Sequence, residues 1–128
     1  MIFKKTWLNV SDGTNVNWLQ TFHLYKGFFR KNSKLGFFIK GSARIVTPPR
    51  LEYKGFKVKF NRKGDVCRGV IIRNTYNVVK PDGNVLNFKN NNLILLKKKQ
   101  EPKSKYLYGP ITKMLKRKRF ISLFKIIF

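Results

Sequence analysis

The most informative stretch of this sequence is GVIIRNTYNVVKPDGNVLNFKNNNLIL, which spans residues 69–95. Three β-branched residues, Val70 to Ile72, follow a glycine and predict a strand. Pro81-Asp82-Gly83 predicts a turn, because proline presets φ, aspartate bonds its own backbone and glycine adopts positive φ freely. Apolar segments over Val85 to Phe88 and Leu93 to Lys97 predict the strands that follow. The stretch therefore indicates a β-hairpin within a mainly β fold.

The segments before this stretch predict further strands over Trp7 to Val10, Asn17 to Lys26 and Val66 to Arg73. Between Gly36 and Val46 the side chains alternate, as in a strand with one face on a core and the other in solvent. The core face is expected to carry Ile39, Gly41, Ala43 and Ile45, and the solvent face Lys40, Ser42 and Arg44. Small residues on the core face predict the narrow interior of a small barrel.

The connection from Pro48 to Arg62 is predicted to leave the barrel, because Pro48-Pro49 cannot continue a hydrogen-bonded ladder. Within it, Phe56, Val58 and Phe60 alternate with lysines, which favours a projecting hairpin arm with a basic edge. We expect this arm to be covered by RNA or by a neighbouring protein.

The pattern changes near residue 100. A basic loop comes first, and Pro110 then suits the first position of a short helix that carries Ile111, Met114 and Leu115 on one face. We expect one domain over residues 1–128, with a barrel over about 1–100 and a basic loop and helical C-terminal segment over about 101–128.

The charge of the chain is strongly one-sided. Among 128 residues, 29 Lys and Arg face five Asp and Glu, which gives a formal net charge of +24. Two such charges about 8 Å apart in water repel by roughly 0.5 kcal/mol, and many pairs together rival the ~5–15 kcal/mol stability of a domain. An external polyanion is therefore expected. No apolar run approaches the ~20 residues of a membrane span, so no membrane partner is expected.

No catalytic constellation is visible in the sequence. His23 has no linked carboxylate or cysteine, the acids are dispersed, and no glycine-rich phosphate loop occurs. The lone cysteine, Cys67, is interpreted as a core thiol. We therefore expect no enzymatic activity, metal, cofactor or small-molecule substrate.

The distribution of cations favours RNA over DNA, because they recur on strand faces, in loops and near the C-terminus, as suits a protein among folded RNA helices. Most of the twelve Phe are expected in the core, although any of them could stack on a base. The predicted RNA-binding residues are Lys40, Arg44, Arg62, Lys63, Arg68, Arg73, Lys80, Lys105, Lys113, Lys116 and Arg117.

The stretch 69–95, with Lys63-Gly64-Asp65-Val66 before it and Tyr108-Gly109-Pro110-Ile111-Thr112 after it, resembles the universal large-subunit ribosomal protein fourteen (L-fourteen) family. The resemblance implies a small five-stranded antiparallel β-barrel with a projecting hairpin and a short C-terminal helix. It also implies binding to large-subunit rRNA at the subunit interface, beside large-subunit proteins of the three and nineteen families. Family members help to form a bridge to small-subunit rRNA, and many accept a ribosome-silencing factor.

We therefore predict a structural constituent of the large ribosomal subunit. The abundance of Lys, Asn, Phe and Ile suggests an A+T-rich gene, and the first residues leave no room for a transit peptide. Together these features favour an organelle-encoded protein of the mitochondrial ribosome, with a plastid or an A+T-rich bacterium as alternatives. The alternative function is a free single-stranded nucleic-acid chaperone of the oligonucleotide-binding barrel type, which would gather its basic and aromatic residues on one strand face. A protein that binds anionic membranes ranks third, because the cations form no long amphipathic helix.

Overall fold

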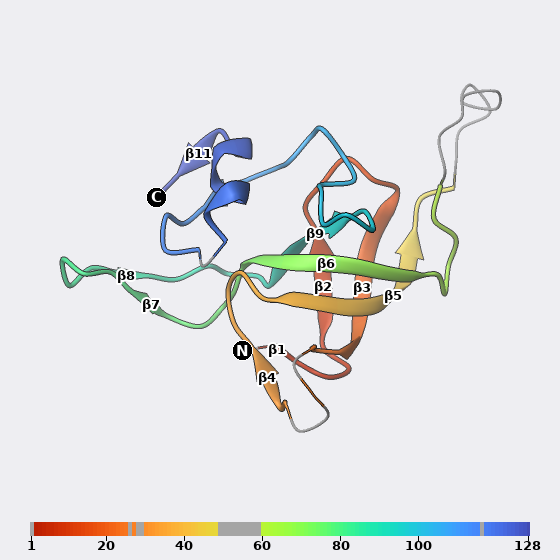
Figure 1. Cartoon of the computed structure of the whole chain (residues 1–128), viewed down its shortest axis with the longest axis horizontal. Coiled ribbons are helices and arrows are strands. Elements are labelled where there is room, and N and C mark those ends of the chain that lie inside the picture. Colours follow the sequence, from red (N-terminus) through yellow and green to blue (C-terminus); the bar gives the residue numbers. More distant parts are fainter. Residues whose placement is uncertain (1, 26, 28–29, 49–59, 116) are drawn as a thin grey trace.

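The computed structural model describes residues 2–25, 27, 30–48, 60–115 and 117–128. Strands dominate this part of the chain (Figure 1). In chain order the elements are β1 (Ile2–Phe3), β2 (Trp7–Val10), β3 (Val16–His23), β4 (Asn32–Ser33), β5 (Phe38–Val46), β6 (Val66–Arg73), β7 (Val78–Val79), β8 (Val85–Leu86), β9 (Asn92–Leu96), β10 (Pro110–Ile111), the 3₁₀ helix η2 (Lys118–Leu123) and β11 (Ile126–Ile127).

Five strands form a closed barrel in the order β2-β3-β5-β6-β9, which confirms the predicted small barrel. The prediction that it is wholly antiparallel was wrong, because β2 and β9 pair in parallel. Geometry explains this parallel pair. Strand directions cannot alternate around a closed ring of five, since an odd number leaves one neighbouring pair running the same way. The barrel is therefore mixed, and its parallel seam joins its first and last strands.

The barrel interior is filled by apolar side chains from every barrel strand, such as Leu8, Leu19 and Ile71. Gly41 is buried, and a Cβ there would collide with the Leu19 side chain and lie 2.6 Å from the carbonyl oxygen of Gln20, so the interior is as narrow as predicted. Ile45 was expected inside but is 48% exposed. Register shifts between β3 and β5 near this end of the strand break the alternation, and Val46 packs against the core instead.

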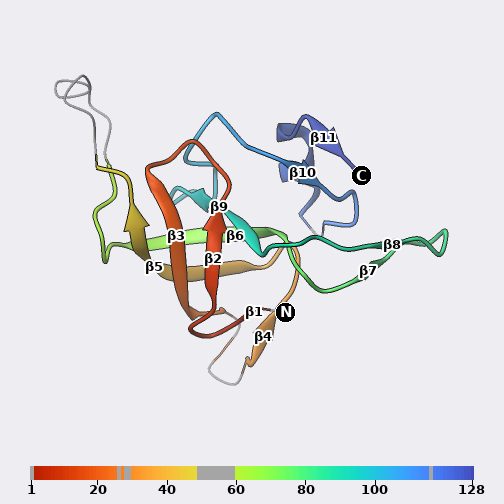
Figure 2. The same ribbon diagram turned by 180° about the vertical axis from the view of Figure 1, so that it is seen from behind.

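A second core lies outside the barrel, against β6 and β9. Val70 and Ile72 from β6 and Ile94 and Leu96 from β9 pack there with residues of the C-terminal segment. That segment lies beside these strands (Figure 2). Strands buried on both faces read as continuous apolar runs, which explains the composition of the two strands. The apolar residues of the segment are Ile111, Leu115, Phe120 and Phe124.

The helix predicted to start at Pro110 is not formed. Pro110 and Ile111 belong to β10, which pairs in parallel with β11. The backbone N–H of Lys113 donates to the carbonyl of Phe128, at 2.8 Å. This N–H therefore bonds to the C-terminal residue and not to the carbonyl one turn earlier, as it would in a helix. In the described part of the C-terminal segment, helical structure begins at Lys118, as the 3₁₀ helix η2. In the part of the chain that the structure describes, no helix is long and apolar enough to cross a membrane.

The hairpin predicted around Pro81-Asp82-Gly83 is present as β7 and β8, which extend away from the barrel (Figures 1 and 2). Most of the predicted arm between Pro48 and Arg62, residues 49–59, lies outside the described residues. Cys67 is a buried thiol of the barrel interior, as predicted, and its burial raises its pKa.

Candidate nucleic-acid interface

The outer face of β5, β6 and β9 carries two adjoining hollows, of about 330 and 670 Å³, which we name the basic groove. The two hollows share Lys40, Arg68, Leu96 and Lys97, so they form one continuous depression. Among the described residues its lining contains seven cations and one acid, Asp65. The cations are Arg30, Lys40, Arg68, Lys97, Lys98, Lys103 and Arg117.

The floor of the groove brings two like charges together. Lys40 on β5 and Arg68 on β6 are register partners in an antiparallel pair, and on the next strand Arg68 faces Leu96. Like charges directly opposite each other on a sheet are destabilising. Within the described residues neither Lys40 nor Arg68 forms an ion pair with a carboxylate. An anion bound between Lys40 and Arg68 would remove their repulsion.

One end of the groove is formed by a guanidinium stacked on a ring. The Cζ atom of Arg117 lies 3.8 Å from the ring centroid of Phe38, and its Nε–H donates to the carbonyl of Gly36 at 3.0 Å. Burial, and next the charge of Arg119, lower the pKa of Arg117, but arginine stays protonated at neutral pH. The contacts to Phe38 and Gly36 hold a flat, charged group at the edge of the first hollow.

Two more aromatic rings of the first hollow also have a cation nearby. The Cζ atom of Arg30 lies 4.6 Å from the ring centroid of Phe37, and the Nζ atom of Lys40 lies 6.0 Å from that of Tyr25. Such pairs stabilise by about 0.5–1 kcal/mol at exposed sites. The first hollow therefore combines positive charge with flat apolar surfaces, which are the two features that single-stranded nucleic acids require.

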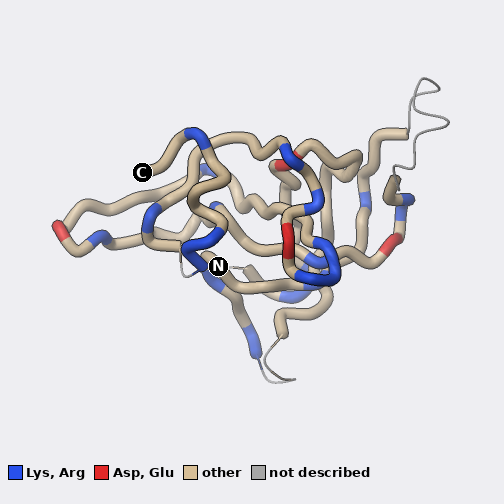
Figure 3. Tube along the Cα trace, turned by 45° about the horizontal axis from the view of Figure 1, so that its top comes forward, with Lys and Arg blue, Asp and Glu red and all other residues tan. Residues whose placement is uncertain are grey.

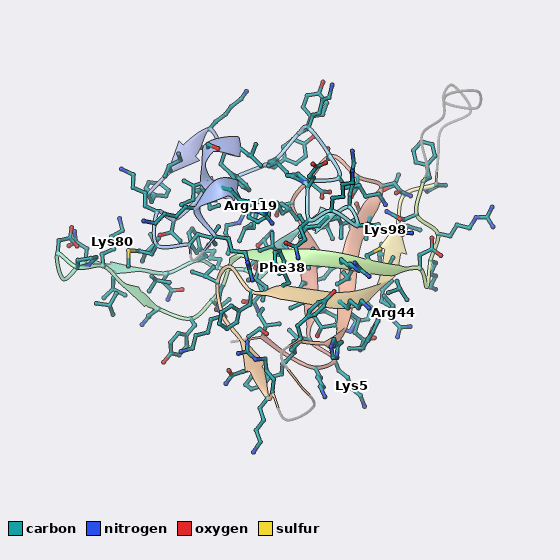
Figure 4. All side chains as sticks on the ribbon, viewed as in Figure 1. Lys5, Phe38, Arg44, Lys80, Lys98 and Arg119 are labelled. Carbon is teal, nitrogen blue, oxygen red and sulfur yellow. The ribbon has the colours of Figure 1, made fainter. Side chains whose placement is uncertain are left out.

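Lys and Arg occur in many parts of the described chain (Figure 3), and the predicted RNA-binding residues among them fall into several groups. Lys40, Arg68 and Arg117 come together in the basic groove. Arg44, Arg62 and Lys63 are exposed at one end of the barrel, where the Gly64 N–H donates to the carbonyl of Ala43. Lys80 lies at the β7–β8 hairpin, far from Arg44 (Figure 4). Lys105 and Lys113 are exposed near the C-terminal segment, and Lys116 lies outside the described residues.

Arg73 is bonded to the protein itself. Its Nη1 donates to the carbonyls of Tyr108 at 2.9 Å and Pro110 at 3.0 Å, and its Nη2 donates to the Ser11 hydroxyl at 2.5 Å. Burial lowers its pKa. The guanidinium therefore links β6 to the end of β2 and to the start of the C-terminal segment. As an RNA ligand Arg73 stays a prediction, and its visible role is structural.

Several residues of the groove were not among the RNA-binding residues predicted from the sequence. Lys97 and Lys98 were assigned to a charged loop, yet this loop is a turn in which Gln100 N–H donates to Lys97 O at 3.0 Å. Its position directly after β9, a strand of the groove, is the signal that could have identified the loop. Most of the twelve Phe were expected in the core, and no sequence pattern singled out Phe37 or Phe38 as part of a binding surface. Arg30 was not predicted to bind RNA, and Lys103, like Lys97 and Lys98, was predicted only to belong to the charged loop.

No group of three or more His, Cys, Asp or Glu side chains that could hold a metal ion occurs in the described ranges. His23 is half-buried, and its ring packs edge-on against Tyr25 with centroids 5.2 Å apart. The basic groove itself is characterised by positive charge and aromatic rings.

The sequence matches the family described as "Ribosomal protein L14p/L23e" over residues 1–127, which include every strand of the fold. It is also 36% identical over 124 residues to the "Large ribosomal subunit protein uL14m" of Tetrahymena pyriformis. That alignment covers 97% of this chain and 97% of the relative. The chain therefore belongs to the ribosomal protein L14p/L23e family.

Proposed function

We propose that this protein binds large-subunit rRNA through the basic groove. Its family consists of structural ribosomal proteins, so the protein is a structural constituent of the ribosome and not an enzyme. The observation that carries the proposal is the cross-strand pair of Lys40 and Arg68 in a groove lined by seven cations and one acid among the described residues. Phosphates are the anions that RNA offers to such a surface.

The proposed location is the mitochondrial ribosome, with the gene in the organelle itself. The relative from Tetrahymena pyriformis is a mitochondrial ribosomal protein and supports this location. The family resemblance further suggests neighbours of the three and nineteen families, a bridge to small-subunit rRNA, and a silencing factor. Exposed apolar residues near the C-terminus, among them Leu123, Ile126 and Phe128, support a protein neighbour on that side.

Cations and aromatic rings gather on one face of the barrel in the groove. This is the arrangement that we expected of a free nucleic-acid chaperone. Cations outside the groove are also numerous, and family membership favours the ribosomal role. Within this role the groove indicates that part of the bound RNA is single-stranded.

The test is a charge reversal of the groove floor. The double variant Lys40→Glu/Arg68→Glu is compared with Lys5→Glu/Lys125→Glu, which changes the net charge equally at two exposed lysines outside the groove. Affinity for a large-subunit rRNA transcript is measured against salt concentration, and sedimentation shows how much of each variant enters large subunits.

We expect the groove variant to lose most of its occupancy in large subunits. The slope of log affinity against log salt should become shallower by the amount that corresponds to about two lost phosphate contacts. The control variant should retain both. Equal behaviour of the two double variants would contradict the proposed interface, because only net charge would then matter.

A further inference from the structure

We propose that the first hollow of the basic groove is a pocket for one unpaired nucleotide of the bound RNA. The base would lie against the stacked Arg117 and Phe38, and the phosphate against Lys40 and Arg68. This inference rests on the proposed function. The hollow, of about 330 Å³, is at the lower end of the roughly 300–1,000 Å³ range of small-ligand pockets.

The rings explain why the nucleotide should be unpaired. A groove that binds only duplex phosphates needs cations but no aromatic surface, whereas an unstacked base is held on rings or on arginine planes. Tyr25, Phe37 and Phe38 all line the first hollow, each with a cation over its ring. Stacking of one base on such surfaces favours the binding of single-stranded RNA.

Arg117 is ordered before any ligand arrives. The Phe38 ring and the carbonyl of Gly36 fix its guanidinium, so little side-chain entropy remains to be lost on binding. The same stack also stabilises the folded protein by itself. A test must therefore separate RNA recognition from folding.

A polar group for the edge of the base is also present. Gln100 lines the same hollow, and its side-chain oxygen accepts from Arg119 Nη2 at 3.1 Å. Its amide nitrogen makes no hydrogen bond within the described part of the chain. Gln100 has φ of 62°, in the left-handed region that is uncommon for a residue other than glycine. The turn therefore brings an amide group to the lining of the pocket, at a cost in backbone strain.

The experiment compares two RNA hairpins with the same stem, one fully paired and one with a single bulged adenosine. Affinities are measured with the full chain, at a salt concentration that weakens nonspecific phosphate binding. The pocket variants are Phe38→Leu, which keeps apolar bulk without the ring, and Arg117→Lys, which keeps the charge without the flat group. The controls are Phe22→Leu and Lys125→Arg, which exchanges one cation for another, both at exposed residues outside the two hollows.

We expect the wild type to bind the bulged hairpin about tenfold more tightly, equivalent to about 1.4 kcal/mol. Both pocket variants should lose this preference and keep their affinity for the paired stem, while both controls retain it. If Phe38→Leu does not fold, Arg117→Lys decides the outcome. Equal binding of the two hairpins by the wild type would overturn the pocket and leave the proposed function intact, whereas failure to bind either hairpin would overturn both.

Discussion

Gly109 leaves the space that the guanidinium of Arg73 occupies: a Cβ at Gly109 would collide with Arg73 Nη1 and lie 2.9 Å from its Cζ. Gly109 also has φ of +80°, a conformation that side chains disfavour. The contact lies where the chain leaves its bond to Ser11 (Tyr108 N–H to Ser11 O, 2.9 Å) and enters β10. A missing side chain at one residue and a long side chain at the other therefore fix the start of the C-terminal segment on the barrel.

The variant Gly109→Ala is expected to lower the free energy of unfolding by about 2–4 kcal/mol, from overpacking and backbone strain together. Gly83→Ala is the matched control, because Gly83 has φ of +90° and no heavy atom lies within 4 Å of the position that its new methyl group would take. The control should lose only about 1 kcal/mol. Denaturant unfolding measures both, and equal losses would show that the contact with Arg73 adds nothing.

The variant Arg73→Lys should lose about 2–3 kcal/mol of unfolding free energy, because lysine keeps the charge but cannot bond three acceptors in a fixed fork. Arg68→Lys, at an exposed residue of the same strand, should change stability by less than about 0.5 kcal/mol. Thermal and denaturant unfolding of the two variants give the comparison. Similar losses would indicate that Arg73 does not anchor the C-terminal segment.

Asp12 gives a pH dependence whose sign follows from its burial. Its Oδ2 accepts from Leu95 N–H at 2.9 Å, and its Oδ1 accepts from Thr14 N–H at 3.0 Å. Desolvation is the largest influence and raises the pKa above 3.8, against the opposing effect of these bonds. A carboxyl with a raised folded-state pKa favours folding below its unfolded pKa, and this contribution is lost as the pH rises through the folded pKa.

The unfolding free energy of the wild type, relative to Asp12→Asn, should therefore fall as the pH rises above about 3.8. At neutral pH the variant should still be less stable by about 1–3 kcal/mol, because an amide group turns a donor toward Leu95 or Thr14. Asp82→Asn, at the exposed β7–β8 turn, is the control. A relative stability that rises with pH would contradict the burial argument.

Two isoleucines of β5 test the break in alternation. Ile39→Val should lower the unfolding free energy by about 0.5–1.5 kcal/mol, since Ile39 is fully buried. Ile45→Val should have almost no effect, since Ile45 is 48% exposed. Urea unfolding of both variants measures this. Equal losses of unfolding free energy would support the regular alternation that the sequence predicted, with both isoleucines on the core face.

The uncompensated charge predicts that polyanions stabilise the isolated protein. Its melting temperature should rise with salt, and further with ribosomal RNA fragments, since both supply counter-charge to a chain with a net charge of +24. Melting followed by circular dichroism at low salt, at high salt and with RNA measures the effect. A high melting temperature independent of salt would contradict the prediction.

Local patterns predicted the barrel strands because each has its own signal. Trp7–Val10 was identified with the bounds that the structure gives. The prediction of a C-terminal helix was wrong, although the spacing of Ile111 and Leu115 correctly predicted that both are buried. The conformation differs because Ile126–Ile127 pair with β10 as a strand, and this tertiary pairing overrides the local helix preference.

The site was predictable only in part, because a groove depends on register. Nothing local to Lys40 or to Arg68 indicates that they lie opposite each other, since that follows from the pairing of β5 with β6. Arg117 reaches the groove only through the packing of the C-terminal segment against β6 and β9. Charge alone predicted a polyanion partner, whereas the aromatic rings at one end of the groove became apparent only from the fold.

The parallel pairing of β2 with β9 affects how the protein can be made. The Asp12 carboxylate and the Leu95 N–H that meet across this seam are 83 positions apart. On a translating ribosome, which adds about 5–20 residues per second, β2 therefore waits on the order of ten seconds for its partner. During that time the nascent sheet has an open edge, and such edges pair with other strands. Binding of this edge by an assembling RNA or by another factor would cover it until β9 is made, so the order of the strands along the chain leaves a defined interval in which such protection would matter.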